Sequence, residues 1–244
     1  MLKIHVLLPV HNESKGIYLL LQAYSRLASH MPYEFMVSII DDASSDDSST
    51  WIKRACSEFK NINLNHIEHA ENMGLSGALN TGFSALKNLR DDDMVITMDG
   101  DNTHNPFLIS SMAEKIDQGA DIVIASRYCE QSRIVGLSKF REFLSHAAKF
   151  FYQLRWHIQG VSDYTCLYRG YRGEIVRKFL ESRGSNMPLS EVGFTCSPEI
   201  LLHMSSFNPV IVEVPMILRY SDKVGASNMR IFKTIGQTLR LLGK

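Results

Sequence analysis

Three polar clusters in this 244-residue chain contain residue types that could carry chemistry: Pro9-Val10-His11-Asn12-Glu13, Asp41-Asp42-Ala43-Ser44 and Asp99-Gly100-Asp101. The third is the most informative, because two carboxylates separated by one glycine repel each other unless a cation lies between them. Oxygen ligands without a nearby Cys favour Mg²⁺ or Mn²⁺, which bridge to substrate phosphates. The spacing therefore predicts a divalent metal site, to which His104 could add a nitrogen ligand. The alternative is loop chemistry, in which Asn102 or Thr103 caps a helix from Pro106.

A fourth segment, residues 71–82, has the glycines and small residues of a helix start. Backbone N–H groups at such a start could face a phosphate. The segment is not a Walker loop, because no Gly-Lys-Ser or Gly-Lys-Thr follows, and no dinucleotide fingerprint follows the first strand.

The elements that must position these clusters alternate between strands and helices. Apolar runs predict strands at Lys3–Pro9, Glu34–Ile40, Asn63–His66, Asp93–Met98 and Ala120–Ser126. Helical spacing predicts helices at Ser14–His30, Ser48–Phe59, Gly77–Asn88 and Pro106–Gln118. This alternation is typical of an α/β fold with a mostly parallel sheet. Ligands of such a sheet bind beyond the carboxyl ends of the strands, where the polar clusters fall.

The regularity ends after Arg127. Residues 139–157 predict a long aromatic helix, Gly193–Ser205 a further helix and Val210–Tyr220 a strand. Residues 230–242 predict a basic amphipathic helix. No internal repeat or low-complexity linker divides the chain, so we expect one domain.

Charge and cysteine content narrow the function classes. The net charge is zero, which argues against a general nucleic-acid binder. Residues 1–126 hold 9 Lys and Arg against 17 Asp and Glu, whereas residues 127–183 hold 11 against 5 and residues 219–244 hold 6 against 1. This division suggests a cation bound early in the chain and an anionic partner bound late. We find no apolar run of about 18 residues and no signal-peptide pattern, and the four dispersed cysteines favour a reducing cytosol.

The order of the motifs resembles a family 2 glycosyltransferase of the GT-A fold, closest to the dolichol-phosphate mannosyltransferase and polyprenyl-phosphate glycosyltransferase branch. The resemblance covers nearly the whole chain. It rests on LLPVHNE (7–13), IIDDASSDDS (39–48), ENMGLSGALNTGF (71–83), MDGDNTHNP (98–106), ASRY (125–128), DYTCLYRGYR (163–172), GFTCSPEIL (193–201) and EVPMILRYSDKVGASNM (213–229). It implies a Rossmann-like, mostly parallel sheet flanked by helices. It also implies a nucleotide-sugar and metal half at 1–126, an acceptor half at 127–229 and an amphipathic helix at 230–244.

The resemblance also assigns residues. It places the nucleotide at Pro9, Asn12, Glu13, Asp41, Asp42, Asn72, Gly74, Asp99 and Gly100. It places the metal, Mg²⁺ or Mn²⁺, at Asp99, Asp101 and Thr103; Thr103 stands where many relatives carry Gln. Donor and acceptor phosphates, or the acceptor pocket, fall at Arg127, Arg141, Asp163, Arg169, Glu199, Arg219 and Ser227. Relatives often follow this serine with Lys, whereas this chain has Asn228.

The implied reaction is a metal-dependent, inverting displacement on a nucleotide-diphosphate sugar, either GDP-mannose or a UDP-sugar. Its catalytic candidates are Asp101, Asp163, Arg127 and Arg219. A hydroxyl acceptor needs a carboxylate base, for which Asp163 is the leading candidate. A lipid monophosphate is already largely anionic at pH 7 and needs cations instead. The basic segment favours a polyprenyl or dolichyl phosphate acceptor.

Other interpretations stay open. The acceptor could be a hydroxyl of a growing polysaccharide, or the chain could be a sugar-nucleotide-binding scaffold subunit. A nucleotidyltransferase would need a glycine- and lysine-rich loop where HNES stands. The aromatic helix at 139–157 and the basic segment at 230–244 could pack inward or lie on a membrane. We expect a cytoplasmic protein, peripheral at the cytoplasmic face of a membrane, with no nucleic-acid partner.

Overall fold

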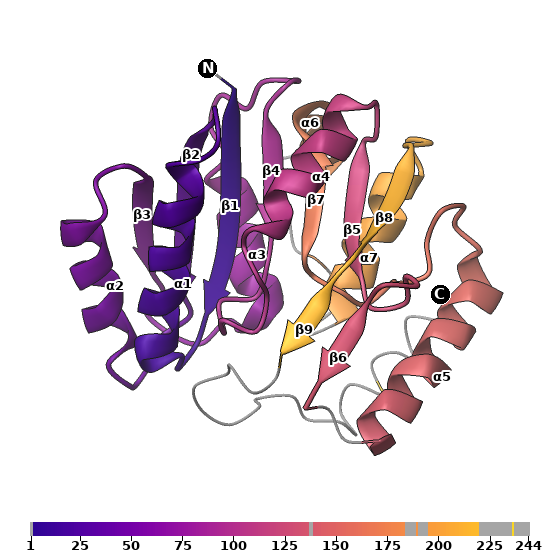
Figure 1. The fold of residues 1–244 in the computed structure, drawn as a ribbon, viewed down its shortest axis with the longest axis horizontal. Coiled ribbons are helices and arrows are strands. Elements are labelled where there is room, and N and C mark those ends of the chain that lie inside the picture. Colours follow the sequence, from indigo (N-terminus) through magenta and orange to yellow (C-terminus); the bar gives the residue numbers. More distant parts are fainter. Residues whose placement is uncertain (1, 137–138, 184–188, 190–194, 220–235, 237–244) are drawn as a thin grey trace.

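The computed structural model describes residues 2–136, 139–183, 189, 195–219 and 236. Its centre is a seven-stranded sheet in the order β3-β2-β1-β4-β7-β5-β8, with a separate two-stranded sheet, β6-β9 (Figure 1). The strands are β1 (Lys3–Val10), β2 (Glu34–Asp41), β3 (Asn63–Glu68), β4 (Met94–Thr97), β5 (Ile122–Ser126), β6 (Arg133–Val135), β7 (Arg169–Arg172), β8 (Ile211–Pro215) and β9 (Ile217–Arg219). Every strand of the large sheet except β7 runs in one direction, which confirms the predicted mostly parallel α/β sheet.

Helices cover both faces of this sheet. They are α1 (Ser14–Ala28), α2 (Ser48–Glu58), α3 (Gly74–Ser84), α4 (Leu108–Asp117), α5 (Lys139–Trp156), α6 (Gly173–Arg183) and α7 (Cys196–Ser205). Figure 1 shows α1, α2 and α4 in front of the sheet and α3, α6 and α7 behind it. Because both faces are covered, β4 and β5 are buried along their whole length, as their unbroken apolar runs require.

The first half of the chain follows the sequence prediction to within a few residues at most element ends. The exception is α3, which begins at Gly74 rather than Gly77. The reason lies outside the helix: the backbone N–H groups of Met73 and Gly74 each donate to the carboxylate of Asp42, at 2.8 Å. A side chain from another strand thus satisfies the first N–H groups of the helix, which local sequence cannot reveal.

The second half differs more. Strand β7 lies between β4 and β5 and antiparallel to both, and neither it nor β6 nor α6 was predicted. The predicted single strand Val210–Tyr220 is wrong, because the chain leaves the large sheet after Pro215. There Met216 N–H donates to Ser126 O and Ser132 Oγ, both at 3.3 Å, and β9 then pairs with β6. The predicted helix at 230–242 lies outside the described residues except at position 236.

Candidate active site

The carboxyl ends of β1, β2 and β4 bring the predicted polar clusters together. Asp42 N–H donates to Val10 O at 2.8 Å, and the His11 ring nitrogen Nδ1 lies 2.8 Å from Asp42 O. A Cβ atom at Gly100 would stand 2.8 Å from Pro9 O, so only glycine lets the third cluster pack this closely on the end of β1. Clusters separated by up to ninety residues therefore form one site.

Asn12 organises the loop after β1. Its φ of 58° is left-handed, a conformation that Asn tolerates better than most residues. Its side-chain oxygen accepts the Ser45 N–H at 2.8 Å and the Asp46 N–H at 3.3 Å, while its own N–H donates to Ser44 Oγ at 3.0 Å. The neighbouring Glu13 is 7% exposed. These two predicted nucleotide-binding residues thus shape the loop that follows them.

The two aspartates at the end of β2 have different surroundings. Both oxygens of Asp42 are occupied by α3, and His69 Nδ1 lies a further 2.8 Å from Oδ1. Asp41 accepts the Ser44 N–H on Oδ1, and its Oδ2 lies 3.8 Å from His66 Nε2. Burial opposes ionisation, but the neighbouring His66 ring and the hydrogen bonding of Ser44 lower the pKa of Asp41 below its ordinary value. Asp41 is therefore anionic at neutral pH.

The predicted phosphate-facing loop is built differently from the expectation. The Gly74 N–H group points to Asp42 Oδ2 and Asn72 Oδ1 rather than to an open anion site. Gly74 has a φ of +72°, which explains the glycine at this position. The Asn72 amide is exposed, and its Nδ2 atom lies 3.2 Å from a ring nitrogen of His11. Asn72 therefore offers a polar group at the rim of the site.

The metal-binding prediction falls on the loop after β4. Asp101 Oδ1 accepts the backbone N–H of Thr103 at 3.1 Å and its hydroxyl at 2.7 Å. Thr103 is 5% exposed, so this contact fixes the orientation of Asp101 from the protein side. The Asp99 side chain is 32% exposed, and its Oδ2 atom lies 3.8 Å from His104 Nδ1.

His104 is the third potential metal ligand that the sequence places at this loop. Its side chain is 6% exposed, and its Nδ1 atom is buried without a hydrogen-bond partner among the described residues. Burial lowers the pKa of His104 to about 4, so the ring is neutral at physiological pH and can offer a nitrogen lone pair. Asp99, Asp101 and His104 thus carry the kinds of oxygen and nitrogen atom that Mn²⁺ accepts, and carboxylate oxygens suit Mg²⁺. In this structure the ligand atoms of the three residues do not all lie within 4.8 Å of one another.

A tighter group of potential ligand atoms lies elsewhere. Within the described ranges, ligand atoms of Asp41, His66 and Glu68 all lie within 4.8 Å of one another. Glu68 is exposed and already accepts a hydrogen bond from Lys53. This group does not coincide with the predicted Asp99–Asp101 pair.

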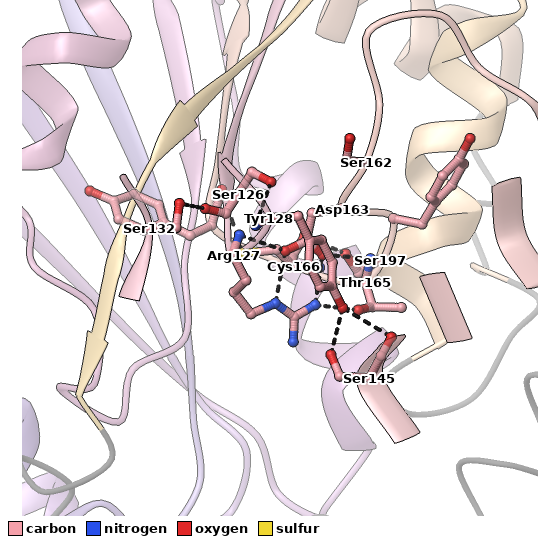
Figure 2. Close-up of polar contacts among 12 residues, drawn as sticks. Ser126, Arg127, Tyr128, Ser132, Ser145, Ser162, Asp163, Thr165, Cys166 and Ser197 are labelled. Carbon is pink, nitrogen blue, oxygen red and sulfur yellow. Dashed lines mark hydrogen bonds and ion pairs between the residues drawn. The ribbon is translucent and has the colours of Figure 1, made fainter. Parts of the chain in front are cut away.

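Arg127 and Asp163 form the best-defined polar contact of the site (Figure 2). Arg127 Nε lies 2.8 Å from Asp163 Oδ2 and Nη2 lies 2.6 Å from Oδ1, a bidentate pair, and the Arg127 N–H adds a third bond to the same carboxylate. The N–H groups of Thr165 and Cys166 also donate to Oδ1. Burial opposes ionisation, but the charge and hydrogen bonds of Arg127 lower the pKa of Asp163.

This geometry does not suit the predicted role of Asp163 as a general base. Asp163 is 0% exposed, both oxygens are occupied and its pKa is lowered, so it cannot readily accept a proton from a substrate hydroxyl. Asp163 is instead a positioning residue for Arg127. The sequence also missed Glu213 of β8, whose Oε1 accepts the N–H groups of Ser162 and Asp163 at 2.6 and 2.7 Å. A single acid within an apolar strand gave no signal of this role.

The remaining residues predicted at the acceptor site have different surroundings in the structure. Arg169, predicted as a phosphate contact, is 0% exposed and donates to the carbonyl oxygens of Ser197 and Tyr164 at 2.7 and 2.6 Å, so two of its nitrogens are used within the protein. Arg219 is exposed, and its N–H donates to Thr103 O at 3.4 Å, in the loop after β4. Arg141 belongs to α5, but its side chain is outside the described part of the chain, as are Ser227 and Asn228. Glu199 is buried, and its Oε1 lies 3.6 Å from Arg183 Nη2.

Fold and site together define an α/β enzyme of the GT-A type, with acidic clusters at the carboxyl edge of a mostly parallel sheet. The family model for glycosyl transferase family 2 matches residues 5–180, and the chain belongs to that family. This confirms the family that the motif order indicated.

Curated relatives include two undecaprenyl-phosphate 4-deoxy-4-formamido-L-arabinose transferases. The chain is 29% identical to the one from Klebsiella pneumoniae over 180 residues, covering 73% of this chain and 51% of the relative. It is 28% identical to the one from Pseudomonas fluorescens over 203 residues, covering 82% and 56%. The chain thus spans about half the length of these relatives.

Solved structures support the fold. Glucosyl-3-phosphoglycerate synthase from Mycobacterium tuberculosis, in complex with phosphoglyceric acid, matches with a TM-score of 0.65 at 16% identity, covering 98% of this chain and 77% of that one. Its complex with Mn²⁺, UDP and glucosyl-3-phosphoglycerate gives 0.63 at 15% identity, with the same coverage. The predicted GT-A fold is therefore confirmed.

Proposed function

We propose that this protein transfers a sugar from a nucleoside-diphosphate donor to a polyprenyl phosphate acceptor, in a reaction that depends on a divalent metal. The observation that carries the choice of acceptor is the Arg127–Asp163 pair. A hydroxyl acceptor needs a free carboxylate base, whereas Asp163 is buried and bonded to a cation. A phosphate monoester needs no base, because its oxygen is already an anion at neutral pH.

The donor end of the proposal rests on the loops after β1, β2 and β4. Asp41 would accept hydrogen bonds from the base, with Pro9, Asn12, Glu13 and Asn72 shaping its surroundings. Asp99 and Asp101 would hold the metal, with His104 behind them and Thr103 orienting Asp101. When bound, a divalent cation neutralises the growing charge of the diphosphate leaving group. The synthase that shares this fold was solved with Mn²⁺ and UDP-glucose.

The acceptor end rests on Arg127. Asp163 engages its Nε and Nη2 atoms, whereas no hydrogen bond joins Nη1 to another described residue, as the unlinked nitrogen in Figure 2 shows. Nη1 would hold an acceptor phosphate oxygen facing the anomeric carbon of the donor sugar. That oxygen forms the new bond to the carbon as the bond to the diphosphate breaks, which inverts the configuration. Arg219, beside Thr103, would add a cation near the leaving group.

Membrane association follows from such an acceptor, because its hydrocarbon chain resides in a bilayer. No helix in the described part of the chain is long and apolar enough to span a membrane. Both curated relatives are named for transfer to undecaprenyl phosphate, which supports the acceptor class.

A transfer assay with paired acceptors tests the proposal. The base of the donor is identified first, by measuring the thermal unfolding of the protein with GDP, UDP or CDP, each in Mn²⁺ and in EDTA. A ligand at about 100 times its dissociation constant stabilises the folded protein by about 2.7 kcal/mol, which this measurement detects. Labelled donors of the base that binds are then offered to undecaprenyl phosphate or to undecaprenol.

We expect transfer to the phosphate alone, lost with EDTA and in Asp101→Asn. Equal transfer to undecaprenol would contradict the phosphate acceptor, and full activity in EDTA would contradict the metal. The absence of nucleotide binding would favour the scaffold alternative.

A further inference from the structure

The outward face of α5 is apolar, which is unusual for a surface helix. Five of its large apolar side chains are between 49% and 73% exposed: Phe140, Phe143, Phe150, Phe151 and Leu154. Figure 1 shows α5 beyond the β8 edge of the large sheet, apart from the helices that cover the sheet. An ordinary surface helix turns polar residues to the solvent and apolar residues to the core.

Helix geometry places these five residues on one side. At about 100° per residue, they fall within an arc of roughly 100°, together with Ala147. The opposite side attaches the helix to the protein. There Tyr152 is 1% exposed and stacks between Tyr164 and Trp156, at centroid distances of 5.7 and 5.3 Å. The exposed apolar arc is therefore not the face that the fold uses for packing.

The charges of α5 indicate what covers that arc. The helix contains four basic residues, Lys139, Arg141, Lys149 and Arg155, against one acidic residue, Glu142. By helical position, Lys139 borders the apolar arc on one side and Arg155 on the other. An apolar arc bordered by cations matches the interface of an anionic bilayer, in which aromatic rings enter the acyl boundary and cations meet lipid phosphates.

The same helix is joined to the candidate site. The Tyr128 hydroxyl lies 2.6 Å from Ser145 Oγ and 2.9 Å from Ser145 O, as Figure 2 shows. Lys149 Nζ lies 4.4 Å from the centroid of the Tyr128 ring. Tyr128 directly follows Arg127, so a surface bound by α5 is brought next to the proposed acceptor-binding cation.

We propose that Phe140, Phe143, Phe150, Phe151 and Leu154 insert into the interface of an anionic lipid bilayer and hold Arg127 at the level of the lipid phosphates. The evidence for the bilayer contact is the exposed apolar arc of α5 and the basic residues that border it. Its use in delivering the acceptor rests on the proposed function.

Vesicle flotation of the full chain tests this contact. The variant Phe143→Ser/Leu154→Ser removes two residues that are 68% and 73% exposed, so neither belongs to the core. The matched control Leu19→Ser/Val210→Ser removes two exposed apolar residues, one from α1 and one from the position just before β8. Vesicles contain phosphatidylglycerol and phosphatidylethanolamine, or phosphatidylcholine alone.

We expect the α5 variant to lower the partition coefficient on anionic vesicles at least tenfold, because each lost side chain removes a large apolar area from the interface. The control should bind like the wild type, and binding should weaken on phosphatidylcholine and in 0.5 M salt, an ionic strength at which the Debye length falls to about 4 Å. A wild type that does not bind, or equal binding by variant and wild type, would overturn the proposal. So would a dimer that dissociates in the α5 variant without any effect of vesicles.

A transfer assay with a short-chain, water-soluble prenyl phosphate separates the two proposals. If the α5 variant loses vesicle binding but keeps this transfer, both proposals are supported. If the wild type binds vesicles but transfers to no lipid phosphate, the bilayer contact stands and the acceptor assignment is overturned.

Discussion

Arg127 and Asp163 form a buried, bidentate ion pair between the end of β5 and the segment that leads into β7, with Nε–Oδ2 and Nη2–Oδ1 distances of 2.8 and 2.6 Å. Asp163 is itself held from β8, where Glu213 accepts its N–H group. The pair therefore connects three segments of the second half of the chain. It leaves Arg127 with a fixed orientation and a side chain that is 15% exposed at the site.

Breaking this pair from the cation side should destabilise the fold. In Arg127→Met, the Asp163 carboxylate stays buried without its partner, which costs about 3–5 kcal/mol. Arg127→Lys restores a charge but not the two-pronged contact, so its loss should be smaller. Urea titration of both variants measures the difference. Equal stability of wild type and Arg127→Met would contradict a stabilising contribution of this pair to the fold.

The pair also predicts how stability depends on pH. The folded pKa of Asp163 lies below its value in the unfolded chain, about 3.9. Its stabilising contribution is therefore fully present above that value and is lost as the pH falls through the lower, folded pKa. In Asp163→Asn this contribution is absent at every pH. The free-energy difference between wild type and variant should shrink between pH 6 and pH 2, and a constant difference would contradict the lowered pKa.

The start of α3 offers a test of the loop that borders the site. Gly74 has a φ of +72°, and its added Cβ would meet no other atom within 4 Å, so the cost of a side chain there is conformational. We expect Gly74→Ala to lose about 1–2 kcal/mol of stability. Gly74→Asn should lose less, because Asn adopts this region more readily. Thermal unfolding measures the stability of both variants. Equal losses of stability would contradict the positive φ of residue 74 as the cause.

The contact between Thr103 and Asp101 predicts an effect on metal affinity. Thr103→Val removes the hydroxyl that donates to Asp101 Oδ1 but keeps the shape of the side chain. Partners that orient a metal ligand in this way contribute roughly tenfold or more to affinity. Titration of Mn²⁺ by electron paramagnetic resonance, with nucleoside diphosphate present, should show this loss. Thr103→Ser keeps the hydroxyl and is the control; equal affinities in the two variants would contradict the orienting role.

The fold of residues 1–126 could be predicted from the sequence because its signals are local. Each buried strand is an apolar run, each helix has its own spacing, and each polar cluster follows its strand directly. The parallel topology then requires the ends of β1, β2 and β4 to meet at one edge. The sequence therefore predicts that the three polar clusters meet, and the order of the motifs indicates the family.

Contacts between segments that lie far apart along the chain were decided only by the tertiary structure. Strand β7 has four residues and enters the sheet only because β4 and β5 leave a place between them, so its sequence carries no strand signal of sufficient length. Asp163 and Arg169 look like site residues in the sequence, but burial and pairing give one a positioning role and the other a structural one. The exposure of the α5 side chains also required the structure. The sequence of α5 has aromatic residues on more than one side of the helix. Only the packing shows that Tyr152 is buried whereas Phe143 and Phe150 are exposed.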